Sequence, residues 1–349
     1  MLNNQRKKNI DNMRGIGIIL VLLGHTAIPL DLDKYIFSFH MPLFFFLSGC
    51  LFNIKKYNNF KIFLKRKFNS LIIPYISFSS VTLLFWVLIG RRFGNYASVS
   101  IEKIFIDFLY GRDLIYNPAL WFLPCLFIVS IIFYTLLYIV KNKYILYSIL
   151  ILSAIVGYFN SIFNTFKFPW GIDIALNAVV FYGLGNLLYS KKDIILIKMA
   201  NYKSIFVFIS LLIFSITCCY LNNSISKVDM AVNKYGNIFY FYLSALSGIG
   251  MIFIVSNCIK SKLLSYIGKN SLILMCLHQT VVFTLLKGIL VFIFKVPKST
   301  INGNSLIWGI IITTISIVIF LPTCYIVNEY FYYFIGKSNK IVYKENQIA

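Results

Sequence analysis

The chain has 349 residues, a net charge of +22 and a strongly apolar composition. Hydrophobic residues make up 59% of it, charged residues make up 13%, and the mean hydropathy is +0.79. An ordinary soluble domain carries about twice that share of charged residues, so the composition excludes this class and indicates an integral membrane protein. In such a protein the positive charge sorts by membrane side, and we expect no nucleic-acid partner.

Apolar runs long enough to cross a bilayer as helices, roughly 17 to 25 residues each, recur along the whole sequence. We expect ten such spans in an all-α, polytopic membrane protein. No soluble appended domain interrupts them, so residues 1–349 are interpreted as a single transmembrane domain. The expected spans are 13–30, 35–53, 70–90, 119–140, 144–160, 172–190, 204–221, 237–259, 268–293 and 305–330.

Basic residues favour one orientation in the membrane. An N-terminus in the cytoplasm places most of the 33 Lys and Arg residues, and both termini, on the cytoplasmic side of the plasma (inner) membrane. The basic loop between the second and third spans suits contact with anionic lipid, or with the phosphates of a nucleotide-bearing cosubstrate. The candidate phosphate ligands in this loop are Lys65, Arg66 and Lys67.

The first expected span contains two ionisable residues, Arg14 and His25, separated by apolar residues and glycine. This spacing makes almost three helical turns, so both side chains lie on one stripe, about 16 Å apart along the axis. Hydrocarbon penalises such residues by about 2.5 kcal/mol or more, which makes the pair a hypothesis for a functional site. The alternative is that Arg14 extends to the headgroups and that His25 is a packed polar residue.

Histidine occurs three times, each time within an expected span. The loop between the first two spans is expected near residue 32, which places His25 and His40 at one depth. His278 lies about 15 Å inside the ninth span by helix rise. Imidazoles are suitable general bases near neutral pH, so His25 and His40 are the catalytic candidates. We expect all three to converge on one cavity, although any one alone could be a hydrogen-bonded packing residue.

Two further features suit a phosphate-bearing ligand, and the second of them lies on the expected cytoplasmic side. Glycines 15, 17 and 24 would let a thin ligand approach the backbone of the first span, or would only allow tight helix packing. The segment from Gly268 to Ser271 opens the ninth span and presents free backbone N–H groups. Together with Lys269 and Ser271, these groups suit a phosphate.

Residue types that suit a sugar gather at the expected external ends of the spans. Carboxylates and amides bond its hydroxyls, and aromatic faces cover its C–H groups. The alternative is an interfacial aromatic belt with solvated loops, which we favour for Trp170. The candidates for acceptor binding are Asp31, Asp33, Asn117, Trp121 and Asp173.

Seven cysteines all fall in the apolar spans. No pair has metal-ligand spacing, and none lies in an external loop where a disulfide framework would be expected. We therefore expect small packing residues and no metal site.

Several short strings, taken in order, resemble the membrane-bound acyltransferase-3 family, which includes fucose-4-O-acetylase-like proteins and O-acetyltransferases of surface polysaccharides. The resemblance covers nearly the whole chain. One position departs from it, because the family often has Arg-x-x-Arg before the proline-tyrosine pair where this chain has Lys67 and Ser70. The matching strings are Arg14 with His25, residues 40–49 (HMPLFFFLSG), 73–75 (IPY), 120–124 (LWFLP) and 268–272 (GKNSL) leading to His278.

The resemblance implies a membrane O-acyltransferase that moves an acetyl or other short acyl group. The donor would be cytoplasmic acetyl-CoA, held by Arg14 and the basic residues, and no metal would be needed. The acceptor would be a hydroxyl of a cell-surface or lipid-linked glycan, with His278 beside it. The alternative is a transporter or flippase of a glycan intermediate, although we find none of the paired, broken half-helices that such proteins often contain.

Overall fold

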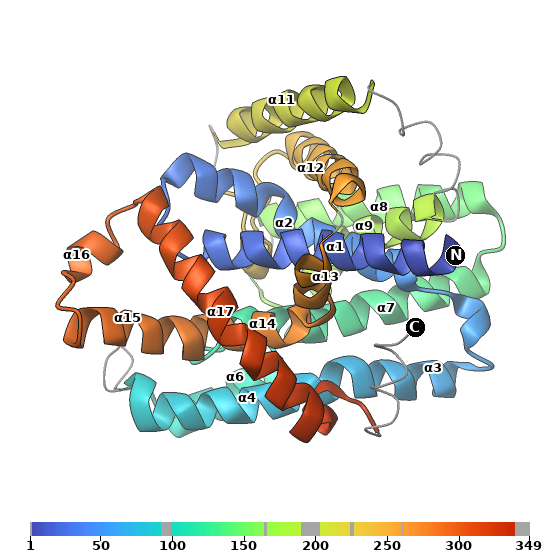
Figure 1. Ribbon diagram of the computed structural model, residues 1–349. Helices are drawn as coiled ribbons and strands as arrows, with labels where there is room; N and C mark the ends of the chain where they lie inside the picture. Colours follow the sequence, from blue (N-terminus) through green and yellow to red (C-terminus); the bar gives the residue numbers. More distant parts are fainter. Residues whose placement is uncertain are drawn as a thin grey trace.

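The computed structural model describes residues 2–91, 99–163, 166–189, 203–223, 227–259 and 261–338. Over these ranges the chain forms helices, and no β-strand appears. Figure 1 shows many of the long helices lying side by side, with their ends grouped at two opposite ends of the molecule. The prediction of an all-α, polytopic membrane protein is confirmed.

Nine helical stretches in the described part of the chain are long and apolar enough to cross a membrane. They match nine of the ten expected spans, mostly to within about five residues at each end. The stretch that matches the third expected span, 70–90, begins earlier, at Phe60, because the basic segment before it is also helical. The nine stretches are Leu30–Leu51, Phe60–Gly90, Pro118–Ile139, Lys143–Phe163, Pro169–Leu188, Ile205–Asn222, Ile238–Cys258, Ser271–Phe292 and Leu306–Tyr330.

The first expected span, 13–30, is wrong in its bounds. Helix α1 (Leu2–Gly24) begins earlier, contains the charged N-terminal residues, and ends well before residue 30. Pro29 explains the early end, since proline lacks an N–H and disfavours helical conformation in the residue before it. Residues 25–29 form a turn that leads into α2 (Leu30–Leu51).

The remaining helices surround α1 and α2, and Figure 1 shows α1 passing through the middle of the bundle. Two π-helical segments, η2 and η7, lie between α-helices that they connect without a break, and a third, η3, follows α4. The elements used below are α3 (Phe60–Lys67), η2 (Phe68–Ile72), α4 (Ile73–Phe85), η3 (Trp86–Gly90), α6 (Ile101–Tyr110), α7 (Phe122–Ile139), α8 (Lys143–Phe163), α9 (Ile172–Tyr189), α11 (Lys203–Asn223), α12 (Ile238–Cys258), α13 (Lys262–Lys269), α14 (Ser271–Leu277), η7 (His278–Val282), α15 (Phe283–Phe292), α16 (Lys298–Ile301), α17 (Leu306–Tyr330) and η8 (Tyr332–Ile335).

Glycines hold α1 close to α13. A Cβ on Gly268 would lie 1.7 Å from the carbonyl oxygen of Asp11, and a Cβ on Gly15 would lie 2.4 Å from that of Leu264. Both positions therefore require glycine for backbone contact between the helices. Of the two roles considered for the glycines of α1, the structure supports tight packing. The others that pack this way, against side chains of α2, are Gly17 and Gly24.

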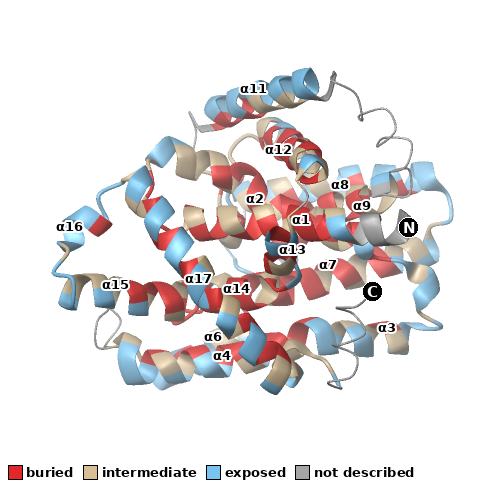
Figure 2. Ribbon diagram, viewed as in Figure 1, coloured by how far each residue is buried: buried red, intermediate tan, exposed pale blue. Residues whose placement is uncertain are grey.

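The buried residues are concentrated on the central helices of the bundle. Figure 2 shows buried residues along α1, α2 and α14, and exposed residues on the outer faces of α8 and α11. Those outer faces are apolar: Phe206 of α11 and Ile151 of α8 are 70% and 62% exposed. In a membrane protein such side chains face lipid. Cys258, at the end of α12, is also exposed and is an exception to the expectation that the cysteines are packed in the core.

The beginning of α1 and the end of the described chain lie at the same end of the bundle, together with α3 (Figure 1). The short helix η8 packs on the segment after α3, where a Cβ on Gly336 would lie 1.7 Å from the carbonyl oxygen of Asn69. We call this the α3 end. The opposite end, with α16 and the turn after α1, is called the α16 end. That the α3 end is cytoplasmic stays a prediction.

Candidate active site

His25 lies in the turn between α1 and α2, directly after the last helical residue. Its backbone N–H donates to the carbonyl oxygens of Val21 and Leu22, so it continues the last turn of α1. The turn is centred near residue 27, not near 32 as expected. His25 therefore lies in the turn while His40 lies ten residues into α2, and the prediction that the two share one depth is wrong.

All three imidazoles are oriented in the same way by their own helices. The Nδ1 atom of His25 lies 2.8 Å from the carbonyl oxygen of Val21, and that of His40 lies 2.8 Å from that of Ile36. The Nδ1 atom of His278 lies 2.9 Å from the carbonyl oxygen of Met275. A carbonyl oxygen only accepts, so each neutral ring carries its proton on Nδ1 and keeps its lone pair on Nε2.

The three rings lie in one cluster. His25 and His278 meet edge to face with 5.0 Å between ring centroids. The ring of Phe37 lies between His25 and His40. Its centroid is 5.7 Å from that of the His25 ring and 4.7 Å from that of the His40 ring. The closest histidine partner of His25 is thus His278 on η7, although the sequence had favoured His40. Histidines from the turn after α1, from α2 and from η7 therefore surround one volume.

A cavity of about 240 Å³ opens beside this cluster. Its walls come from α1, α2, the segment before α7, the loop before α12, and the end of α14 with the start of η7. His278 is fully buried behind it, and its Nε2 atom has no hydrogen-bond partner in the structure. The residues with polar or aromatic side chains that line the cavity are His25, Phe37, His40, Phe44, Trp121, Lys227, Asp229 and Gln279.

Three polar residues of the cavity were not predicted from the sequence. Lys227 places its ammonium 3.6 Å from the centroid of the Phe37 ring and forms an ion pair with Asp33. Asp229 accepts a hydrogen bond from the backbone N–H of Ala231. Burial raises the pKa of the Asp229 carboxyl, although that N–H, Lys227 and His25 act in the opposite direction. The third residue, Gln279, has a buried Oε1 atom without a partner.

These three residues come from two places in the chain. Lys227 and Asp229 belong to the loop between α11 and α12, which covers the cavity, and Gln279 follows His278 on η7. The only sequence signal for the loop is its charged residues, which resemble those of any solvated loop. For Gln279 the signal is a polar amide inside an apolar span.

Arg14 lies near the α3 end of α1, about 16 Å from His25 by helix rise. Lys67, the last residue of α3, lies near enough for the two cations to repel each other. Its ammonium lies over the rings of Phe52 and Tyr182, at 5.9 and 6.0 Å from their centroids. Both side chains are half-buried, and the Asp11 carboxylate near Arg14 offsets only one of the two positive charges, so the pair is suited to an anionic ligand.

The other candidate phosphate ligands lie less deeply. Lys65 and Arg66 are exposed on α3, where Arg66 donates to the carbonyl oxygen of Lys56. Lys269 is exposed at the end of α13, and Ser271 is half-buried at the start of α14. Of the basic residues of α3, the structure turns Lys67 towards Arg14 and leaves its two neighbours at the surface.

The candidates for acceptor binding are divided. Trp121 lines the cavity, and Asp33 contributes through its ion pair with Lys227. Asn117 is buried beside the cavity, where its amide donates to the carbonyl oxygen of Cys276 at 2.7 Å, and its Oδ1 atom has no partner. Asp31 is exposed at the start of α2 and is not among the lining residues.

Asp173 lies away from the cavity. Both of its carboxylate oxygens accept from the guanidinium of Arg112 at 2.8 Å, and both side chains are 2% exposed. Trp170, which we had attributed to an interfacial belt, donates from Nε1 to the carbonyl oxygen of Leu109. This bond and the ion pair both hold α6 and the loop after it against α9 and the turn before it. Asp173 is therefore left out of the acceptor site proposed below.

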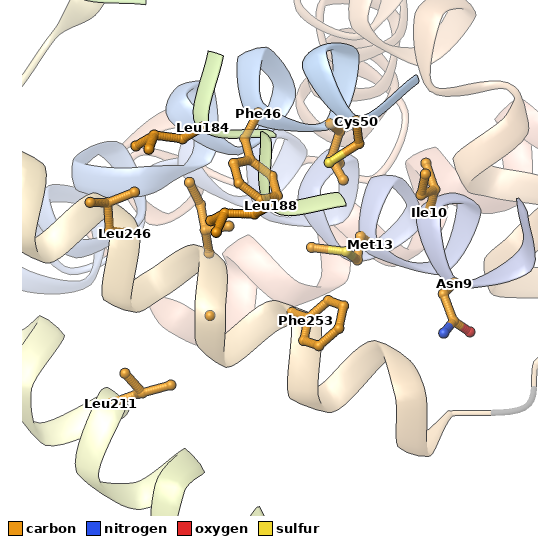
Figure 3. Close-up of a pocket in the computed structure, with 13 residues that line it drawn as sticks. Asn9, Ile10, Met13, Phe46, Cys50, Leu184, Leu188, Leu211, Leu246 and Phe253 are labelled. Carbon is orange, nitrogen blue, oxygen red and sulfur yellow. The ribbon is translucent and has the colours of Figure 1, made fainter. Parts of the chain in front are cut away.

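A larger cavity, of about 350 Å³, lies near the α3 end (Figure 3). It is lined by α1, α2, α9, α11 and α12, and the figure shows leucines, Phe46 and Phe253 around it. Asn9 is its one strongly polar side chain among the lining residues that the structure describes. Acyl transfer requires a base and polar donors, so the smaller histidine cavity is the better candidate active site.

A search of family models matches residues 7–334 to a model described as an acyltransferase domain. The chain belongs to the acyltransferase-3 family. Neither the curated proteins nor the solved structures gave a match. The matched residues include those of the histidine cavity and the Arg14–Lys67 pair. The protein is a multi-pass membrane acyltransferase. This assignment favours an enzyme over the transporter considered above.

Proposed function

We propose that this acyltransferase moves an acetyl group from acetyl-CoA to a hydroxyl of a cell-surface or lipid-linked glycan. The observation that supports this most is the histidine cluster, in which three Nδ1–H groups are bonded to carbonyl oxygens and the Nε2 atoms are left as acceptors. A neutral imidazole held in one tautomer is the form that removes a proton from a hydroxyl.

The donor would enter from the α3 end. Arg14 and Lys67 would bind its phosphates, since guanidinium and ammonium groups both pair with phosphate oxygens. The extended pantetheine arm would then run along α1 towards His25, a path of about 16 Å. This arrangement places the thioester at the histidine cavity while the nucleotide stays at the membrane surface.

At the cavity, the Nε2 atom of His25 would accept the proton of the acceptor hydroxyl as its oxygen attacks the thioester carbonyl. The new C–O bond forms, the tetrahedral intermediate collapses, the C–S bond breaks, and the imidazolium returns the proton to the leaving thiolate. Lys227 and the side-chain amide of Gln279 would stabilise the negative charge on the carbonyl oxygen, as donors in such positions do. His278 would support His25 from behind.

The acceptor would occupy the α16 side of the cavity. Trp121 offers an aromatic face, and Asp229 offers a carboxylate for a sugar hydroxyl. The cavity, at about 240 Å³, would admit a single acceptor group, and the rest of a polymer would lie outside it.

The test is acyl transfer by purified protein that is given radiolabelled acetyl-CoA and a panel of glycan acceptors. His25→Asn is the informative variant, because its side-chain amide can still donate to Val21 but cannot act as a base. We expect it to lower the rate by about 10²- to 10⁴-fold while the protein remains folded. Normal product levels in this variant would remove His25 from the catalytic role.

Sidedness is tested with membrane vesicles of both orientations. Acetyl-CoA is supplied on one face and a non-permeant acceptor on the other. We expect product when the donor has access to the α3 end and the acceptor to the α16 end. Product that forms only with both reagents on the α3 side would show that the enzyme works on one face.

A further inference from the structure

Lys287 lies in α15, within the apolar stretch Ser271–Phe292, and it takes no part in the proposed reaction. It lines a cavity of about 530 Å³ near the α16 end, between α15, α16 and the end of η3. Lys298, the first residue of α16, lines the same cavity. Every lining residue that the structure describes is neutral or cationic, so the cavity has a positive charge that no carboxylate within it offsets.

The walls of this cavity are apolar. Ile89 closes it on the η3 side, and Leu285, Ile289 and Phe292 form the α15 side. The last three side chains are also 44%, 42% and 57% exposed, so the apolar wall continues onto the outer surface of the helix. In a bilayer that surface contacts acyl chains. A cationic cavity that continues into a lipid-facing surface matches an amphiphile with an anionic head.

We propose that this cavity binds one anionic phospholipid of the surrounding bilayer. Lys287 and Lys298 would pair with the phosphate, because ammonium groups bind phosphate as point charges. Asn302 accepts a hydrogen bond from Lys287 at 3.2 Å, which positions the ammonium at the cavity. The proximal part of one acyl chain would lie along the α15 wall. This inference does not depend on the proposed acyl transfer.

Gly288 explains how a headgroup can enter between the helices. A Cβ built on this glycine meets no atom within 4 Å, so the glycine faces open space inside the cavity. A glycine within a helix lowers helix propensity, and the structure shows no backbone contact that requires one here. A glycine at position 288 keeps this space open for a ligand.

The test is native mass spectrometry of detergent-purified protein titrated with phosphatidylglycerol, and separately with phosphatidylcholine. We expect one tightly held phosphatidylglycerol and weaker phosphatidylcholine. A lysine near the membrane surface contributes about fivefold to such affinity, so Lys287→Met with Lys298→Ser should weaken binding about 30-fold. Lys295→Asn removes a charge from the same loop, outside the cavity, and should leave binding unchanged.

A second variant separates space from charge. Gly288→Leu keeps both lysines and places a four-carbon side chain inside the cavity, so it should weaken binding, whereas Gly288→Ala should preserve it. Thermal unfolding with and without phosphatidylglycerol checks that all variants fold. Equal binding of the two lipids, equal loss in the Lys295→Asn control, or unchanged binding in Gly288→Leu would each overturn the proposal. Displacement of the lipid by millimolar inorganic phosphate would also overturn it, because the site would then recognise phosphate alone.

Discussion

Replacing Lys67 by Met tests whether the Arg14–Lys67 pair holds the donor. The lysine is half-buried, with its ammonium over two aromatic rings and near a second cation. Methionine keeps the length of the side chain and its contact with the rings, but it removes the charge. Because the two cations repel each other, the substitution should not destabilise the protein, and its effect should appear in donor binding.

The magnitude follows from the burial of this lysine. A hydrogen bond to a charged group in such surroundings contributes about 1.5–3 kcal/mol, so its loss should raise KM for acetyl-CoA about 10- to 150-fold. The matched control is Lys65→Met, two residues earlier on the same helix. Lys65 is exposed, and exposed charge pairs are weak and screened by salt, so its KM should rise less than about fivefold.

The assay is initial-rate kinetics of the purified enzyme over a range of acetyl-CoA concentrations at a fixed acceptor concentration. Loss of uniform donor binding raises KM and leaves kcat unchanged. Equal KM changes in Lys67→Met and Lys65→Met would show that the basic rim acts only as a diffuse field. A lower kcat with unchanged KM for the donor would refute the assignment of Lys67 to the phosphates.

Three further predictions concern two residues of the histidine cavity and the ion pair beside α6. Asp173→Ala should destabilise the protein by about 3–5 kcal/mol, because it leaves the Arg112 charge buried without its partner; thermal unfolding measures this, and KM for both substrates should not change in the folded fraction. Lys227→Met should lower kcat about 10²-fold if the ammonium stabilises the oxyanion, while Lys234→Met in the same loop should have little effect. Asp229→Asn should raise thermal stability at pH 7 but not at pH 4, since a raised pKa makes ionisation unfavourable only above the usual pKa of aspartate. A gain at both pH values would assign the effect to hydrogen bonding.

Nine of the ten spans, and the choice of the histidines as candidates, follow from local sequence. Apolar runs set the helices, and a histidine inside such a run is unusual whatever surrounds it. Local sequence does not show which side chains pair with each other in the folded protein. Asp173 looked like a sugar ligand at a span end, yet it is paired with Arg112, about sixty residues away in sequence. The pairing depends on how α6 docks on α9, which periodicity does not show.

The cavity residues of the loop before α12 could not be found from the sequence for the same reason. Lys227 and Asp229 lie in a polar stretch where charged residues need no explanation. Their role depends on the loop folding back over α2, so that Lys227 meets both Asp33 and Phe37. The proline that ends α1 early also mattered, because it moved His25 from the interior of a helix into the turn beside this loop.

The course of α1 resolves a conflict between hydropathy and topology. Nine apolar stretches, counted over the described residues, would place the two ends of the chain on opposite faces of the membrane. The structure has the start of α1 and η8 at one end of the bundle. Its 23 residues span about 34 Å, which is enough for a tenth crossing. A hydropathy scan misses α1 because the helix carries charged residues. The helix tolerates this charge because α2, α12, α13 and α17 pack around it and shield it from lipid. Arg14, one of the charged residues that make α1 a poor span, is thus the one that the proposed donor site requires.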